Sequence, residues 1–314
     1  MDYYIGLDIG GTKCAVTLGR LNDDTVEIID KYRFTTIPNA PDKVLNLFNT
    51  SIQKYSRKVT ISGIGISCGG PLDSKRGVIL GPPNLPGWNH VEILRYFQES
   101  YSVPIYLQND ANACAVAEWK YGAGRGCENM VFLTFGTGLG AGLILNGRLY
   151  TGTNDMAGEG GHWRLTADGP VGYGKTGSFE GFCSGGGIAV QAKARVSAGK
   201  CLRLLQEAKT PDNISAKLVG DLAEQGDEDC IQIYAECGRM LGRGLALIID
   251  ILNPQKIVIG SIFERSRGLL WKYAQQEIEK EALAYSTNVC EVKSALLGDL
   301  IGDYAALSLA AGGH

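Results

Sequence analysis

The chain has 314 residues and a formal net charge of −3, and its 20% charged and 45% hydrophobic residues are typical of a soluble globular protein. Lysine and arginine are spread along the chain, so no basic block indicates a nucleic-acid partner. The start MDYYIGLDIGG lacks the basic segment and apolar stretch of a signal peptide. We therefore expect a cytoplasmic protein that binds neither nucleic acid nor a membrane.

Residues 3–20 predict a β-hairpin, because two apolar runs flank a Gly-Gly-Thr turn. A helix is expected over 41–56, a buried strand that ends at a glycine pair over 59–70, and an amphipathic helix over 90–101. Residues 104–122 then predict a short strand, an Asn-Asp pair and a helix.

The second half repeats this pattern. Residues 130–145 predict another hairpin with a Gly/Thr turn, 226–252 the longest helix, 256–261 a buried strand and 300–312 a closing helix. The uncharged stretch 129–147 approaches the length of a membrane span, but its glycines and β-branched residues favour strand–turn–strand. Alternating strands and helices predict the α/β class, and the two similar hairpins indicate an internal duplication.

The nine cysteines are scattered, and none has C-x-x-C spacing. This distribution argues against both a disulfide framework and a thiolate metal cluster. We expect reduced, mostly buried thiols, as in cytosolic proteins.

Residues 169–178, GPVGYGKTGS, fit the phosphate-loop pattern G-x-x-x-x-G-K-[ST]. A working phosphate loop follows a buried strand and opens a helix at its Lys-Ser/Thr pair. The flanking HWRLTAD and GSFEGFCSGGG predict neither element, so we interpret the match as chance. GTGLGA at 136–141 likewise resembles a dinucleotide fingerprint but precedes strand-like residues. A nucleoside triphosphatase that uses Lys175 is kept as an alternative.

The two hairpin turns are better candidates for phosphate binding, because successive free backbone N–H groups form an anion-binding concavity. The turn residues are Gly10, Gly11 and Thr12 in the first hairpin and Gly136, Thr137 and Gly138 in the second. Asp8 precedes the first turn, and a carboxylate beside phosphates is repulsive unless a divalent cation lies between them. The pattern predicts Mg²⁺ bound by Asp8 and mostly by water; two ordinary glycine turns are the alternative.

Taken in order, eight short motifs resemble those of the ROK family of sugar kinases. They are DIGGTK (8–13), GISCGGP (65–71), NLPGW (84–88), NDAN (109–112), FGTGLGAG (135–142), AGEGGH (157–162), SFEGFCSGGGI (178–188) and LNPQKIVIGS (252–261). The motifs cover essentially the whole chain and are specific as a set. The resemblance implies a two-lobed actin/hexokinase-type (ribonuclease H-like) α/β fold, with ATP and a sugar in the central cleft. The expected lobes are 1–109 plus 297–314, the smaller, and 110–296, the larger.

The resemblance also implies a role for each matching residue. Asp110 matches the catalytic base that takes the proton of the sugar hydroxyl; a helix N-cap is the less favoured alternative, because an Asn-Asp pair before an apolar helix is common. Gly260 matches the adenosine motif, where Ser261 and Ile262 replace further glycines. The expected contacts to nucleotide and Mg²⁺ are Asp8, Gly10, Gly11, Thr12, Lys13, Gly136, Thr137, Gly138 and Gly260. The expected contacts to the sugar are Gly70, Asn84, Asn109, Asp110, Glu159, His162 and Glu180.

In most ROK proteins the segment after the Gly-His pair reads C-x-C-G-x-x-G-C-x-E, and its three cysteines bind a structural zinc together with the histidine. The cysteine positions fall here on Val171, Tyr173 and Ser178, so that only His162 remains of four ligands. We therefore expect no structural zinc. The side chains expected to replace it by packing are Val171, Tyr173, Phe179 and Phe182.

These features predict an ATP- and Mg²⁺-dependent kinase that transfers the γ-phosphate to a hydroxyl, expected to be O6, of a hexose or its amino or N-acetyl derivative. Family members are often dimers, so a homodimer is expected. The alternative is a non-catalytic sugar sensor, since ROK proteins include repressors with a DNA-binding extension before the first turn; Asp8 lies too near the start for one. Glucose, fructose, N-acetylmannosamine, N-acetylglucosamine, a glucoside and an aminocyclitol all stay open.

Overall fold

The structure, a computed structural model, describes residues 2–22 and 25–312. Contacts divide the chain into two units. Unit 1 consists of Met1–Glu128, Gly142–Ala157 and Leu296–His314, and unit 2 of Asn129–Ala141 and Gly158–Ala295. The expected lobes differ from these units in assigning 110–128, 142–157 and 296 to the second part. Residues 1, 23, 24, 313 and 314 of the expected small lobe lie outside the described residues.

Unit 1 is built on a five-stranded sheet of order β3-β2-β1-β4-β8. The strands are β1 (Tyr3–Ile9), β2 (Lys13–Leu21), β3 (Val26–Thr35), β4 (Ile61–Cys68) and β8 (Ile105–Asn109). β1 pairs antiparallel with β2 and parallel with β4, and β4 pairs parallel with β8. A small sheet adds β5 (Leu72–Asp73), β6 (Val78–Leu80) and β7 (Asn89–Val91).

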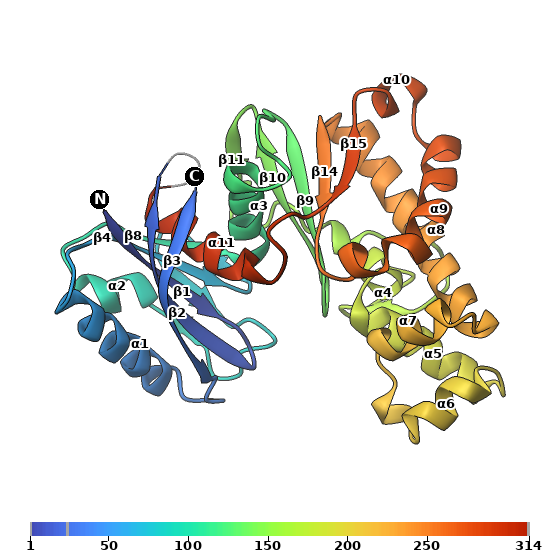
Figure 1. Ribbon diagram of the computed structural model, residues 1–314, viewed down its shortest axis with the longest axis horizontal. Helices are drawn as coiled ribbons and strands as arrows, with labels where there is room; N and C mark the ends of the chain where they lie inside the picture. Colours follow the sequence, from blue (N-terminus) through green and yellow to red (C-terminus); the bar gives the residue numbers. More distant parts are fainter. Residues whose placement is uncertain (1, 23–24, 313–314) are drawn as a thin grey trace. The chain divides into compact units, whose positions relative to one another are not determined.

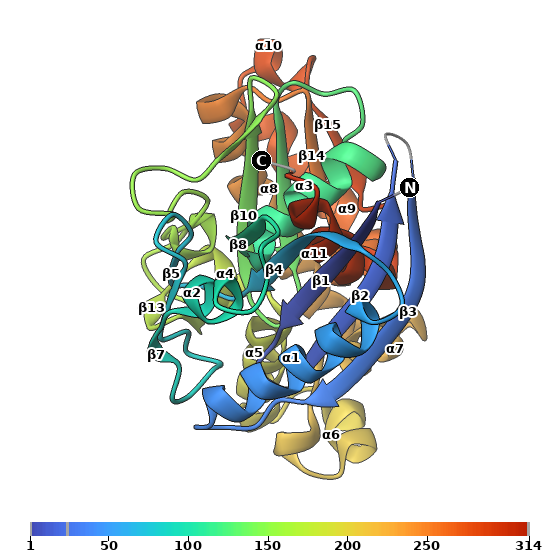
Figure 2. The ribbon, with the colours of Figure 1, turned by 90° about the vertical axis from the view of Figure 1, so that its left-hand side faces the viewer.

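Helices cover both faces of the sheet of unit 1. On one face α1 (Pro41–Ser56) and α2 (Ile93–Gln98) bury Phe48 and Phe97 in a common core with the strands (Figure 2). On the other face lie α3 (Asp110–Tyr121) and α11 (Ile301–Ala310), which pack on each other through alanines (Figure 1). α11 comes so close that a methyl group at Gly65 of β4 would lie 2.1 Å from the carbonyl oxygen of Ala306.

The second five-stranded sheet has the order β11-β10-β9-β14-β15, and the division between the units passes through β10. Its strands are β9 (Met130–Phe135), β10 (Leu139–Leu145), β11 (Arg148–Tyr150), β14 (Lys256–Ile259) and β15 (Glu291–Ser294). The helices of unit 2 are α4 (Phe179–Phe182), α5 (Gly185–Ser197), α6 (Leu202–Ala208), α7 (Ala216–Glu224), α8 (Glu228–Leu252), α9 (Ile262–Glu281) and α10 (Ala284–Thr287). A short hairpin joins β12 (Val171–Gly172) to β13 (Lys175–Thr176).

Most elements expected from hydrophobic periodicity are confirmed. The first hairpin and α1 have the expected bounds, whereas α2 spans only six residues of the helix expected over 90–101. No helix among the described residues combines the length and hydrophobicity needed to cross a bilayer.

The segment with the phosphate-loop pattern is confirmed not to form a phosphate loop. Lys175 lies in β13, opposite Gly172 of β12, and no helix begins at it. Tyr173 and Gly174 form the two-residue tip, both with positive φ, as a tight hairpin of this kind requires.

Candidate functional site

In unit 1, the carboxyl ends of three parallel strands bring together predicted residues that are far apart in sequence. Ile9 of β1 lies opposite Cys68 of β4, which lies opposite Asn109 of β8. Asp8, Gly70 and Asp110 therefore reach the same edge of the sheet, where ligands of parallel α/β sheets commonly bind.

Glycines at this edge allow close approaches of the chain. A methyl group at Gly11 would lie 2.4 Å from the backbone oxygen of Asn84, so the first turn and the predicted sugar-binding Asn84 are direct neighbours. A methyl group at Gly70 would lie 3.0 Å from Nδ2 of Asn109. The sequence-predicted residues of unit 1 thus form one cluster.

The structure shows which residue occupies the N-cap position of α3. Asn109 is the N-cap of α3, and its side-chain oxygen accepts the N–H of Ala111 at 2.9 Å. Asp110 is the first helical residue, and its Oδ1 shares the same donor at 2.8 Å. Surrounding protein raises the pKa of Asp110, while hydrogen bonds from the backbone N–H groups of Ala111 and Asp110 itself lower it. The side chain stays exposed to solvent, so a substrate hydroxyl can reach it.

Asp8 is surrounded by other charges. Burial, then the carboxylates of Asp110 and Asp303, raise its pKa to about 6, and Lys31 and Arg33 oppose this rise. An oxygen-only ligand in a region of excess negative charge fits a hard cation such as Mg²⁺, which needs few protein ligands and keeps its water.

Thr36, which follows β3, holds the first turn from outside the motif. Its backbone N–H donates to the carbonyl oxygen of Thr12 at 3.0 Å, and its hydroxyl donates to that of Gly10 at 2.6 Å. No local pattern in the sequence marks Thr36, because the contact joins residues 26 positions apart. Among the hydrogen bonds of the described residues, none uses the N–H of Gly11 or Thr12.

In unit 2, the second turn contacts Glu180, a predicted sugar-binding residue. Oε2 of Glu180 accepts the N–H of Leu139 at 3.0 Å and would lie 2.7 Å from a methyl group at Gly138. A methyl group at Gly161, in the AGEGGH motif, would lie 2.2 Å from the carbonyl oxygen of Leu139. Glu159 and His162 flank this contact and are both exposed. In unit 2, residues that the sequence predicts to contact phosphate therefore lie next to residues that it predicts to contact the sugar.

The second turn is also held by a helix that is distant in sequence. The N–H groups of Gly185 and Gly186, at the start of α5, donate to the carbonyl oxygens of Gly136 and Thr137 at 2.8 and 3.2 Å. As expected, a strand and not a helix follows the turn directly.

The loop that resembles a zinc site is closed by hydrogen bonds at one former cysteine position. Ser178 is fully buried; its Oγ donates to the carbonyl oxygen of Gly172 at 3.2 Å and accepts the N–H of Gly181 at 3.1 Å. Phe179 and Phe182 are buried as expected. The packing role expected for Val171 is wrong, because it lies on the hairpin and is 53% exposed, whereas Tyr173 is 64% exposed but keeps a ring contact.

His162 and Tyr173 keep a contact where the family pattern has two zinc ligands. Their rings meet edge to face with centroids 6.1 Å apart. Across the described ranges, no three histidine, cysteine or acidic side chains come together as a metal-binding group. The absence of structural zinc stays a prediction that metal analysis must test.

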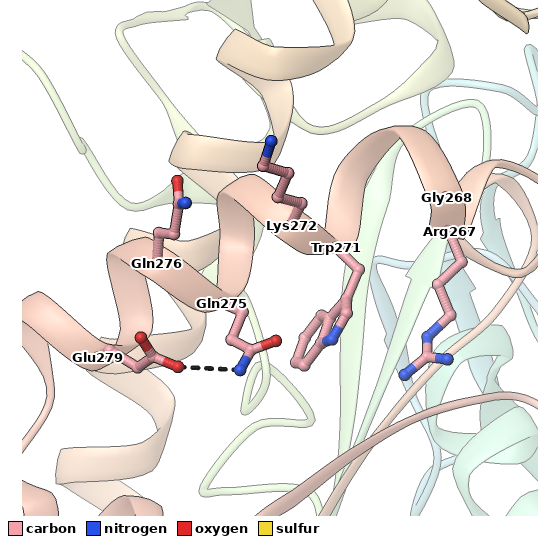
Figure 3. Close-up of a pocket in the computed structure, with 7 residues that line it drawn as sticks. All are labelled: Arg267, Gly268, Trp271, Lys272, Gln275, Gln276 and Glu279. Atoms are coloured by element: carbon pink, nitrogen blue, oxygen red, sulfur yellow. Dashed lines mark hydrogen bonds between the residues drawn. The ribbon is translucent and has the colours of Figure 1, made fainter.

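A cavity of about 840 Å³ opens beside the second turn and is a candidate nucleotide pocket. Gly136 and Thr137 line it together with the starts of α5 and α9 and with one face of α7. Gly260 is not in the lining, but the next residue, Ser261, is. A second pocket, of about 630 Å³, is lined along α9 alone by residues such as Arg267 and Trp271, and it contains no predicted site residue (Figure 3).

Comparison with known proteins shows the family to which the chain belongs. The sequence model of the ROK family matches residues 4–312. A glucokinase of Halalkalibacterium halodurans is 32% identical, over 96% of this chain and 92% of its own length. The crystal structure of a ROK family glucokinase from Streptomyces griseus in complex with glucose and AMPPNP is 28% identical, covers 99% of both chains and gives a TM-score of 0.81. A xylose repressor of Caldicellulosiruptor bescii is 29% identical over 82% of this chain, and the match spans 65% of the repressor.

The fold and the family matches define a sugar phosphotransferase with the two-domain actin-like ATPase fold. The chain belongs to the ROK family and is an ATP-dependent sugar kinase. The fold and family expected from the sequence motifs are thereby confirmed.

Proposed function

We propose that this kinase transfers the γ-phosphate of ATP to the 6-hydroxyl of a hexose or of its amino or N-acetyl derivative. The observation that carries the proposal is the placement of Asp110. It stands exposed at the sheet edge beside Asp8, while Asn109 serves as the cap of α3. Asp110 is thus available for chemistry.

Asp110 is proposed as the general base. Its carboxylate would accept the proton of the sugar hydroxyl as the oxygen attacks phosphorus, a contribution of about 10²- to 10⁴-fold. A pKa raised by the surrounding protein favours this role, because a base works best when its pKa approaches the working pH. Phosphoryl transfer otherwise depends on positioning and charge neutralisation.

The two turns are proposed to hold the phosphates of ATP. Successive backbone N–H groups near Gly11 and Thr137 suit anionic oxygens, and Thr12 and Lys13 add a hydroxyl and an ammonium group. Mg²⁺ would be held by Asp8 and water and would supply the positive charge that separates this carboxylate from the phosphates. The cavity beside Gly136 would receive the nucleoside, next to Gly260.

Polar side chains and the backbone of one glycine are proposed to bind the sugar, since each hydroxyl removed from water needs a partner. The proposed contacts are Gly70, Asn84, Asn109 and Asp110 in unit 1 and Glu159, His162 and Glu180 in unit 2. The glucokinase relatives make glucose the first sugar to test. We also propose that the kinase is a homodimer, which sedimentation tests, and that it is cytoplasmic, which cell fractionation tests.

The position of transfer is tested by analysing the product. The enzyme is incubated with ATP, Mg²⁺ and the preferred sugar, and the phosphorylated carbon is identified by phosphorus-coupled NMR. We expect coupling to the protons on carbon 6 and no turnover of the 6-deoxy sugar. A phosphate on another carbon would overturn the assignment of O6, and sugar binding without any ADP release would favour the sensor.

A further inference from the structure

Ser261 has a backbone conformation that side chains rarely adopt. Its φ is 62° and its ψ is −110°, in a region that favours glycine. The residue lies between β14 and α9, directly after Gly260. Strained conformations that persist with a side chain often mark functional positions, which directs attention to the hydroxyl of Ser261.

The hydroxyl of Ser261 faces the second turn and is held by an arginine. Nη2 of Arg265, in the first turns of α9, donates to Oγ of Ser261 at 3.2 Å. The same Oγ would lie 3.8 Å from a methyl group at Gly136. Both side chains line the 840 Å³ cavity together with Gly136 and Thr137.

Two cationic side chains line this cavity, and among the described residues Arg265 is the one whose charge is not neutralised by an ion pair. The other cationic lining residue, Lys217, is ion-paired with Asp221 at 2.6 Å. In the ranges that the structure describes, none of the ion pairs includes Arg265. Its guanidinium group also keeps donors beyond the one used by Ser261, because arginine carries five N–H groups in a fixed fork.

We propose that Arg265, positioned by Ser261, binds a phosphate of the nucleotide that is not transferred. The proposal rests on the proposed function, because it assumes that the phosphates lie along the second turn. A planar guanidinium can bind two oxygens of one phosphate, which a lysine cannot reproduce. Arg265 is then a determinant of nucleotide affinity, and Ser261 is its positioning residue.

The test compares adenosine with ADP, both titrated calorimetrically into the whole protein in the presence of Mg²⁺. Arg265→Ala is expected to weaken ADP binding by roughly 10- to 100-fold, the range of a charge-assisted hydrogen bond, and to leave adenosine binding unchanged. Arg265→Lys is expected to restore only part of the loss. Equal weakening of adenosine and ADP would show that the arginine contacts the nucleoside and would overturn the proposal.

Arg267→Ala is the matched control, since it removes the same charge two residues away. Arg267 packs over the ring of Trp271 at 5.4 Å in the separate pocket of Figure 3, so ADP binding should not change. Ser261→Gly relieves the backbone strain while removing the hydroxyl, and it is expected to weaken ADP binding several-fold with a thermal stability no lower than that of the wild type. Unchanged ADP binding in both Arg265→Ala and Ser261→Gly would contradict the phosphate-binding role of Arg265 and leave the proposed function standing. A wild-type protein that binds neither adenosine nor ADP would instead contradict the proposed function.

Discussion

Three carboxylates of unit 1, those of Asp8, Asp110 and Asp303, interact electrostatically, and each has a different environment. Asp303 is buried on α11, where Lys31 pairs with it at 2.5 Å and the Thr17 hydroxyl donates to it at 2.7 Å. Asp110 is exposed, and Asp8 lies near both. Burial, and then the negative charges of Asp110 and Asp303, raise the pKa of Asp8 to about 6, so ionising Asp8 carries a cost in the folded protein.

This cost predicts that Asp8→Asn stabilises the metal-free protein at alkaline pH. The pKa of Asp8 is about 6 in the folded protein against an ordinary 3.8, so the folded state binds this proton more tightly. That contribution to stability is complete below pH 3.8 and is lost as the pH rises through 6. At pH 8 the variant removes a penalty of at most about 3 kcal/mol. Calorimetric melting in EDTA should give a Tm a few degrees higher than wild type at pH 8, with a smaller gain at pH 5; a lower Tm at pH 8 would contradict this.

Asp110→Asn tests the proposed base. The amide keeps the shape of the carboxylate but cannot accept the proton, so kcat should fall by at least about 10²-fold while the sugar still binds. Coupled ADP release gives kcat, and calorimetry gives the sugar affinity. Asp212→Asn, at a fully exposed position of unit 2, is the control and should match wild type. Near-normal turnover of Asp110→Asn would remove Asp110 as the base.

Thr36→Val tests the support of the first turn. Valine has the same shape but cannot donate to the carbonyl oxygen of Gly10, so the turn loses one buried hydrogen bond. With about 1 kcal/mol for such a bond, KM for ATP should rise roughly fivefold while the sugar affinity is unchanged. Thr36→Ser should recover most of the loss. A Thr36→Val enzyme with wild-type KM for ATP would show that the turn does not need this support.

At the scale of elements, the segment 169–182 forms a closed loop from hydrogen bonds and aromatic packing. Ser178 bonds to Gly172 and Gly181, and Phe179 stacks on Trp163 with ring centroids 6.5 Å apart. These contacts join the hairpin β12-β13 to α4, the helix that carries Glu180. We therefore interpret the loop as one whose internal contacts can orient Glu180 without a metal ion.

This interpretation predicts that catalysis survives removal of zinc. The enzyme is treated with a strong zinc chelator and assayed after Mg²⁺ is resupplied, and its zinc content is measured by mass spectrometry. Activity should stay at the untreated level, because Val171, Tyr173 and Ser178 offer no thiolate. Stoichiometric zinc in the purified protein, with loss of activity on its removal, would falsify the prediction.

For the whole molecule, local patterns were sufficient for much of the fold. Turn chemistry and periodicity predicted both hairpins, α1, α3 and α8, and the motif order predicted the family. The small sheet β5-β6-β7 was not expected, because strands of two or three residues have no detectable period. The division into units could not be predicted from the sequence either, because unit 1 consists of three separate chain segments.

Residues of the candidate site could be predicted where they belong to motifs. They could not be predicted where they reach the site through contacts between segments that are distant in the sequence. Asp8, Asn109 and Asp110 reach one sheet edge as strand order requires. Thr36 was missed because its contact with the first turn is tertiary. Arg265 was missed as well, although the serine in place of glycine at 261 was a visible signal.

The most direct test of the account measures ADP and sugar phosphate together in the wild-type enzyme. Purified protein, ATP and Mg²⁺ are incubated with each sugar of a panel that includes glucose, fructose, N-acetylglucosamine and N-acetylmannosamine. The account predicts that at least one sugar stimulates ADP release and yields one sugar phosphate for each ADP. ADP release that no sugar stimulates, in a protein that binds a sugar by calorimetry, would contradict it.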